Sequence, residues 1–186
     1  QESCIRLLGI VNDFRDIKIL EGKRIQLKKE VFDVTEPIRE VLEELKEKAL
    51  AKNLPVIFGN QALLPSVFAD RDKTKEIIMN LVTNAIQYTE KGDIRVIVEE
   101  MEKFVKISVT DTGIGIDTEL QSSLFQKFNT VRKRFVQSKE YGSGMGLYIS
   151  KLLTESMGGK IHLLKSVPGV GSTFEVLLPC FTQNSE

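Results

Sequence analysis

The stretch EIIMNLVTNAIQYT, residues 76–89, decides the fold class of this chain. At about 100° per residue, its polar residues Glu76, Asn80, Asn84 and Gln87 fall in one sector of a helix. The apolar residues fill the rest of the wheel: Ile77, Ile78, Leu81, Val82, Ala85 and Ile86. A solvated face carries Lys and Glu more often than Asn, because they form helices better. The stretch therefore predicts a helix with one buried face and one stripe of amide oxygens.

The elements on either side of this helix predict an α+β fold. Capping residues and apolar stripes predict helices over about 35–53, which Thr35-Glu36-Pro37 opens, about 70–89, which Asp70-Arg71-Asp72 opens, and about 147–157. Apolar runs predict extended segments at 25–27, 31–34, 55–58, 66–68, 94–98, 105–109, 160–164 and 173–178. This order predicts a two-layer α/β sandwich, with a mixed, mostly antiparallel sheet covered on one face by about three helices.

Composition limits the partners and the setting of the chain. A length of 186 residues fits one domain, and 26 basic residues balance 26 acidic ones, which argues against nucleic-acid binding. No apolar run approaches the roughly 20 residues of a membrane span, so no membrane contact is expected. Cys4 and Cys180 are too few for a disulfide scaffold, and a reducing cytosol fits them best. The start of the chain has neither an initiator Met nor a signal-peptide pattern, which suggests a piece of a longer protein.

Three local patterns could bind parts of a nucleotide. Asn80 and Asn84 offer neutral amide oxygens that suit Mg²⁺, although a polar helix face explains them as well. Residues 111–116, DTGIGI, place a carboxylate at the end of a strand, followed by two closely spaced glycines. The carboxylate could accept a hydrogen bond from an exocyclic amine while the glycines let the backbone pack against a planar ring, or the segment could be an ordinary turn. Residues 142–147, GSGMGL, open a helix after a basic loop and could bind phosphate.

Together these patterns make the chain resemble the ATP-binding catalytic domain of sensor histidine kinases. That family also contains DNA gyrase, MutL and the heat-shock chaperone ATPases. Residues 80–89 resemble its asparagine box, 111–116 its first glycine box, 124–128 its phenylalanine box and 142–147 its second glycine box. Gly171-Ser-Thr-Phe174 matches the closing strand. The resemblance covers about residues 23–180 and implies the Bergerat-type ATP-binding fold.

The resemblance also implies roles for individual residues. Asn80 would bind Mg²⁺, Asp111 would bind the adenine amine, and Thr173 would support Asp111 through a water or hydroxyl bond. Phe125 and Phe128 would pack the root of the lid, the loop that closes over ATP, against the rest of the domain. The implied ATP-binding residues are Asn80, Asn84, Gln87, Tyr88, Asp111, Gly113, Ile114, Gly115, Ile116, Phe128, Gly142, Ser143, Gly144, Met145, Gly146, Leu147 and Thr173.

The implied reaction moves the γ-phosphoryl group of ATP to a histidine on a separate dimerisation helix, and then to an aspartate of a response regulator. By this resemblance, 1–22 would be the end of the dimerisation and phosphoacceptor hairpin, 23–181 the catalytic domain and 182–186 a flexible tail. The parent would be a homodimer that can be membrane-bound, and this domain would be cytoplasmic. The implied cofactors are ATP and Mg²⁺.

Departures from the family pattern keep other functions open. Gln87 stands where these kinases usually carry a Lys, and Thr130 stands near the usual place of an Arg that Arg132 or Lys139 could replace. Glu76 lies one turn before Asn80, where the gyrase and chaperone ATPases carry a general base. A sister ATPase that uses Glu76, or a non-catalytic regulatory module, are therefore the alternatives.

The single histidine, His162, lies in a predicted strand. We expect it to be a half-exposed strand residue, because the acceptor histidine of the family lies on an upstream helix. The chain by itself is therefore expected to bind ATP without phosphorylating itself.

Overall fold

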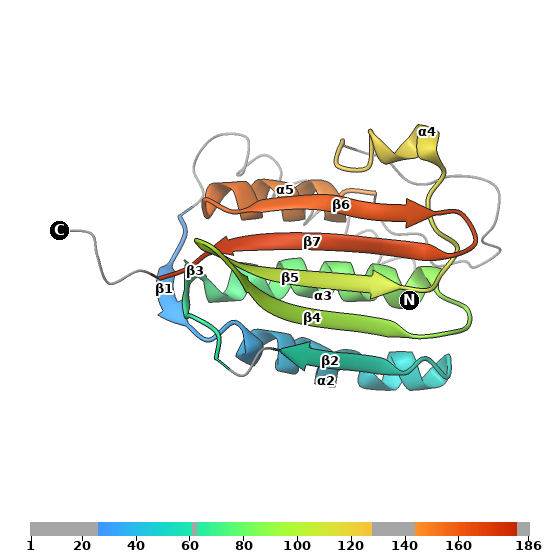
Figure 1. Cartoon of the computed structure of the whole chain (residues 1–186), viewed down its shortest axis with the longest axis horizontal. Helices are drawn as coiled ribbons and strands as arrows, with labels where there is room; N and C mark the ends of the chain where they lie inside the picture. Colours follow the sequence, from blue (N-terminus) through green and yellow to red (C-terminus); the bar gives the residue numbers. More distant parts are fainter. Residues whose placement is uncertain (1–25, 61–62, 128–143, 182–186) are drawn as a thin grey trace, which may run out of the picture.

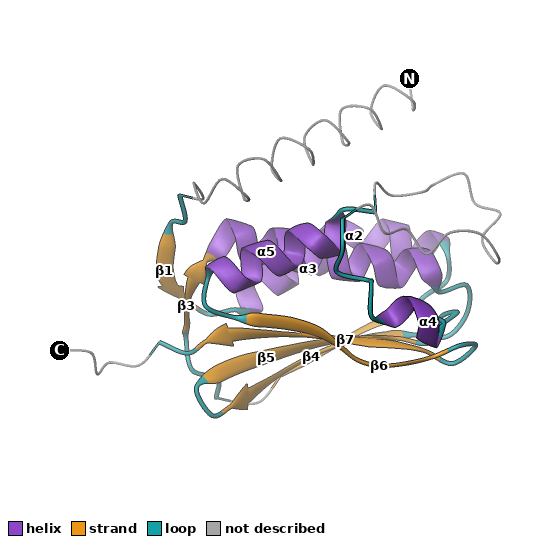
Figure 2. Ribbon diagram, turned by 90° about the horizontal axis from the view of Figure 1, so that it is seen from above, coloured by secondary structure: helices purple, strands orange, loops and turns teal. Residues whose placement is uncertain are grey.

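The structure is a computed structural model, and it describes residues 26–60, 63–127 and 144–181. A five-stranded sheet is covered on one face by the helices α2 (Thr35–Ala51), α3 (Arg71–Tyr88) and α5 (Gly146–Ser156) (Figures 1 and 2). The predicted two-layer α+β sandwich is thereby confirmed. The predicted hairpin end at 1–22 and tail at 182–186 lie outside the described residues.

The large sheet is mixed and mostly antiparallel, as predicted. Its order is β2-β4-β5-β7-β6, and only β2 and β4 run parallel, while β1 and β3 form a separate antiparallel pair. The strands are β1 (Lys29–Phe32), β2 (Val56–Asn60), β3 (Val67–Asp70), β4 (Ile94–Met101), β5 (Phe104–Asp111), β6 (Lys160–Val167) and β7 (Gly171–Pro179). A bridge between Val67 and Cys180 joins the small sheet to the end of β7.

The core lies between the sheet and the helices. Alternate residues of the central strands point into it and are fully or almost fully buried: Ile94, Val96, Val98, Val105, Ile107 and Val109. The apolar side of α3 packs against them, and every residue placed there by the helical wheel is buried. Because α3 lies between α2 and α5, its polar stripe is directed along the helix layer instead of into the core.

The predicted cap of α2 needs correction. Thr35 is already helical, and its backbone N–H donates to the Asp33 carboxylate at 2.8 Å. Asp33 therefore supplies the oxygen that we had expected from Thr35. Strand β1 ends at Phe32, short of the predicted 34. The helix then stops at Ala51, not at 53. By contrast, Asp70 caps α3 as predicted, accepting from the Lys73 N–H at 3.0 Å.

Strands β4 to β7 are longer than their apolar runs predicted. Strand pairing continues past the apolar runs into polar and glycine positions, so that β5 runs up to Asp111 and β7 begins at Gly171. The short helix α4 (Thr118–Gln121) was not predicted, since its four residues are all at least partly exposed. Residues 26–28 are in no strand, which corrects the expected extended segment at 25–27 for the part that is described.

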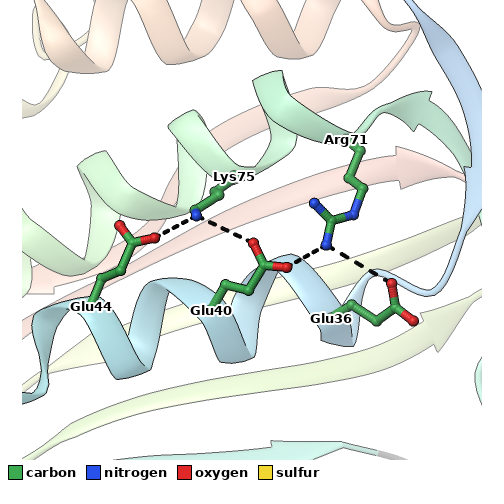
Figure 3. Close-up of polar contacts among 5 residues, drawn as sticks. All are labelled: Glu36, Glu40, Glu44, Arg71 and Lys75. Carbon is green, nitrogen blue, oxygen red and sulfur yellow. Dashed lines mark hydrogen bonds and ion pairs between the residues drawn. The ribbon is translucent and has the colours of Figure 1, made fainter.

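Helices α2 and α3 are joined on their outer side by a ladder of ion pairs (Figure 3). Glu36, Glu40 and Glu44 follow one another at every fourth residue of α2 and face Arg71 and Lys75 of α3. Arg71 contacts Glu40 and lies 4.0 Å from Glu36, while Lys75 contacts Glu44 and lies 3.2 Å from Glu40. The ladder links the exposed sides of α2 and α3.

Candidate nucleotide-binding site

The polar stripe of α3 meets the first half of α5. The Asn80 Nδ2 donates to the Ser150 hydroxyl at 3.0 Å, and Ser150 is almost fully buried in α5. The Asn84 Nδ2 in turn approaches the Asn80 Oδ1 at 3.4 Å, a long contact. Ser150 therefore fixes which way the Asn80 amide points, and the Asn80 oxygen keeps capacity for a further partner.

Gly146, the first residue of α5, lies directly against this oxygen. A Cβ built on Gly146 would overlap the Asn80 Oδ1, so glycine at this position leaves the space that the Asn80 amide occupies. The asparagine box and the second glycine box, 66 positions apart (146 − 80), thus meet at one point. A neutral oxygen held beside the start of a helix is a suitable ligand for a hard divalent cation that also binds phosphates.

Asp111 ends β5 and is almost fully buried, with 7% of its surface exposed. Its Oδ1 accepts from the Gly113 backbone N–H at 2.9 Å. Burial raises the pKa of Asp111, and hydrogen bonds from the backbone N–H groups of Gly113 and Ser172 offset part of that rise. A buried carboxyl with remaining acceptor capacity can bind an exocyclic amine.

The first glycine box lies between the end of α3 and the β6–β7 turn. The Ile114 N–H donates to the Tyr88 carbonyl at 3.1 Å, and a Cβ on Gly113 would overlap the same carbonyl. On the other side, the Gly169 N–H donates to the Ile114 carbonyl at 2.7 Å, and the Ile116 N–H donates to the Ser166 hydroxyl at 2.8 Å. Gly115 packs against the Val167 carbonyl. Gly113, Ile114, Gly115, Ile116 and Tyr88 thus come together as expected from the sequence.

Thr173 does not lie with them. Asp111 pairs with Ser172 and Thr110 pairs with Thr173, so Thr173 points to the face of the sheet away from the helices. Its hydroxyl is 3.0 Å from that of Thr110. The residue beside Asp111 is Ser172, which the sequence analysis missed. Strand alternation from the buried Phe174 could have placed Ser172 on the helix side.

The remaining boxes are described in part. Met145 is almost fully buried in the core, so its side chain does not line a binding surface, and Leu147 packs partly buried against the same core. Gly144 begins the described part of this segment. Phe125 packs edge-on against Phe174, with ring centroids 6.3 Å apart. Phe128, Gly142, Ser143, Thr130 and its possible basic substitutes Arg132 and Lys139 lie outside the described residues.

Two further predicted positions on α3 have defined contacts. The Glu76 carboxylate lies 2.7 Å from the Lys73 ammonium, an ion pair within the helix. The Gln87 backbone carbonyl accepts from the Lys52 ammonium at 3.0 Å. Lys52 is a second residue that the sequence analysis missed, because nothing local links the end of α2 to the end of α3.

Two kinds of feature are absent from residues 26–60, 63–127 and 144–181. No group of three or more His, Cys, Asp or Glu side chains there could hold a metal ion. A cation at Asn80 would therefore need further ligands from phosphate or water. None of the helices described is both long and apolar enough to cross a membrane.

Comparison with known proteins identifies the family. Residues 69–181 match the family of histidine kinase-, DNA gyrase B- and HSP90-like ATPases. The sensor histidine kinase GacS of Pseudomonas protegens is 35% identical over 96% of this chain, and the histidine-protein kinase BarA of Escherichia coli is 34% identical over 94%. The chain spans 20% and 19% of these two relatives, about a fifth of each.

Solved structures agree with these matches. The catalytic domain of the histidine kinase ThkA has a TM-score of 0.71 at 32% identity, covering 83% of this chain and 97% of that one. The full-length kinase ShkA, solved in complex with AMPPNP, has a TM-score of 0.87 at 27% identity, covering 99% of this chain and 38% of that one. The chain therefore belongs to the histidine kinase-, DNA gyrase B- and HSP90-like ATPases, and within them to the catalytic domains of histidine kinases.

Proposed function

We propose that this domain binds ATP with Mg²⁺ along the polar stripe on α3, between Asn80 and the C-terminal end of the helix near Asp111. Asp111 would accept a hydrogen bond from the adenine amine, and Asn80 would bind the cation that the phosphates share. The observation that carries this proposal is that α3 joins both places. Tyr88 at its end contacts the loop after Asp111, and Asn80 two turns earlier contacts the start of α5. At about 1.5 Å per residue, these positions are about 12 Å apart, which suits an extended nucleotide.

The residues of the site would act by position and by charge. The amide oxygen of Asn80 would hold the cation without repelling phosphate, because it is neutral. The buried carboxyl of Asp111, fixed by two backbone N–H groups, would read the adenine edge. Mg²⁺ would neutralise charge on the phosphates as the γ-phosphoryl group leaves. Ser150 and Gly146 keep the Asn80 amide in place, so it does not have to reorganise on binding.

The phosphoryl acceptor would be a histidine on a separate dimerisation helix of a longer parent, with a response regulator as the next partner. This follows from similarity: GacS and BarA are named as histidine kinases, and ThkA has been solved with the response regulator TrrA at 30% identity to this chain. A cytoplasmic location of the domain fits a reaction that consumes ATP. The signal that the parent detects and the choice of its response regulator would depend on other parts of the parent.

Calorimetric titration with the non-hydrolysable analogue AMPPNP, with and without Mg²⁺, tests the nucleotide site. We expect Asn80→Ala to remove the effect of Mg²⁺ and Asp111→Asn to weaken binding at any Mg²⁺ concentration. Asp72→Asn is the matched control, since it removes one carboxylate from an exposed position at the start of the same helix. Equal affinity of the Asn80→Ala variant and the parent chain in Mg²⁺ would refute the role of Asn80.

A second experiment separates kinase from ATPase. In the full-length parent, Glu76→Gln should leave phosphohistidine formation intact, because the Glu76 carboxylate already pairs with Lys73. Release of free phosphate that depends on Glu76, with no phosphohistidine, would instead support an ATPase with Glu76 as general base.

A further inference from the structure

Lys52, the residue that follows α2, binds the end of α3. Its ammonium donates to the carbonyl oxygens of Ile86 at 2.7 Å, Gln87 at 3.0 Å and Thr89 at 3.4 Å. The last turn of α3 contains no basic residue of its own. Lys52 therefore supplies, from another helix, the positive charge that a helix C-terminus favours.

The other carbonyl groups at this end are also used. The Ala85 carbonyl accepts from the Thr89 N–H at 3.1 Å, and the Tyr88 carbonyl accepts from the Ile114 N–H at 3.1 Å. Lys52 thus occupies one side of the helix end, and the first glycine box occupies the other. A shift of the helix end on losing Lys52 would move the Tyr88 carbonyl, and with it Ile114.

Thr89 contributes little to holding this end through its side chain. The residue is fully buried, and its hydroxyl has no hydrogen-bond partner among the described residues. The hydrogen bonds at the end of α3 are therefore made by its backbone, and in three of them the Lys52 ammonium is the donor. Charge-assisted hydrogen bonds of this kind are the stronger ones.

We propose that Lys52 is a positioning residue for adenine recognition. By fixing the carbonyl end of α3, it fixes Tyr88, and through Tyr88 it fixes Ile114 and Gly113 beside the Asp111 carboxyl. The effect on adenine recognition rests on the proposed nucleotide site. The contacts that link Lys52 to Ile114 are present in the structure without nucleotide. Lys52 does not touch the nucleotide in this scheme.

Amide hydrogen exchange without nucleotide tests the link itself. Lys52→Met keeps the aliphatic stem and removes the donors, and we expect exchange at the Ile114 and Thr89 amides to accelerate by about tenfold or more, because losing a single charge-assisted hydrogen bond already accounts for about that factor. The Ile149 amide, bonded to the Met145 carbonyl at the start of α5, is the internal reference and should keep its rate. Unchanged exchange at Ile114, or equal acceleration at all three amides, would overturn the role of Lys52.

Nucleotide titration tests the consequence. Lys52→Met should lower the preference for Mg·ATP over Mg·GTP, while Lys52→Arg should restore it because the guanidinium also donates to carbonyls. Lys46→Met is the matched control, since Lys46 lies on the same helix and pairs only with Glu43 in the contacts described. A Lys52→Met variant that keeps the full preference would overturn the inference. Failure of the unmodified chain to bind either nucleotide would instead refute the proposed function.

Discussion

At the scale of single residues, Asp111 combines a cost in stability with the role in adenine binding that we propose for it. Burial raises its pKa, because a carboxylate loses hydration at this depth, and two backbone N–H groups compensate only in part. Buried carboxyl groups with a shifted pKa occur most often at functional sites. The site residues are therefore expected to trade stability against affinity.

We predict that Asp111→Asn stabilises the domain at neutral pH while it weakens nucleotide binding. The folded-state pKa lies above the ordinary value of 3.8, so the carboxyl favours folding when protonated, below 3.8. This contribution is lost as the pH rises through the raised pKa. The advantage of the variant in Tm should therefore be largest near pH 7 and shrink towards about pH 4. An advantage that grows on acidification would contradict the assignment.

We predict that Gly146→Ala acts through Asn80. In the unmodified chain the added Cβ meets the Asn80 Oδ1, so both Tm and the effect of Mg²⁺ on AMPPNP affinity should fall. In an Asn80→Ala background the overlap is gone, and the same substitution should change Tm little, since alanine suits a helix. Thermal melts of the four proteins form a double-mutant cycle. Additive changes in Tm would show that the two residues do not interact.

At the scale of elements, the ladder between α2 and α3 is an exposed network of ion pairs. The stability that it contributes depends on the salt concentration. Glu40 lies at its centre, contacting both Arg71 and Lys75, and the hydrogen bonds from these cations hold the pKa of its carboxyl below the ordinary value. The hydrogen bond to Glu40 raises the pKa of Arg71, and the hydrogen bonds to Glu44 and then Glu40 raise the pKa of Lys75. Exposed pairs of this kind are weak and are screened by salt.

We predict that Glu40→Gln lowers Tm slightly at low salt and not at about 1 M NaCl, where charges are screened. The contribution of Glu40 is present above its ordinary pKa of 4.5 and is lost as the pH falls through the lower folded value. Glu43→Gln is the control, because Glu43 pairs only within α2 in the contacts described. A loss in Tm that persists at high salt would mean that Glu40 acts by packing instead of charge.

At the scale of the whole molecule, the sheet separates two chemical surfaces. Asn80 and Asp111 lie on the helix side, whereas His162 pairs with Glu175 on the opposite face. There the His162 Nε2 lies 2.9 Å from the Glu175 carboxylate, and the Ser108 hydroxyl donates to the same carboxylate at 3.4 Å. His162 is thus engaged with a carboxylate behind the sheet, away from the proposed site.

We predict that this chain, incubated with Mg·ATP, gains no phosphate on His162. The sheet lies between this imidazole and the proposed γ-phosphoryl position, and in-line transfer needs the two groups in contact. Mass spectrometry of the intact chain and its peptides checks this, with a relative's phosphorylated histidine as positive control. Phosphate on His162, lost in His162→Gln, would contradict the placement of the site.

The sequence by itself determined what depends on local periodicity. The buried and polar faces of α3 follow from a 3.6-residue repeat, and Asp111 at the end of a strand follows from the apolar run before it. The order of the boxes then indicated the family and the nucleotide. These features need only neighbours in the chain, so a single sequence was enough to find them.

Only the tertiary structure decided which distant residues meet. The register of β7 against β5 placed Ser172 directly opposite Asp111, 61 positions away along the chain (172 − 111), whereas strand alternation alone could have shown only that Ser172 faces the helices. Packing of α2 and α5 against α3 brought Lys52 to the end of α3 and Gly146 to Asn80. Register and helix packing are set by how the whole core fills, and no local pattern carries that information.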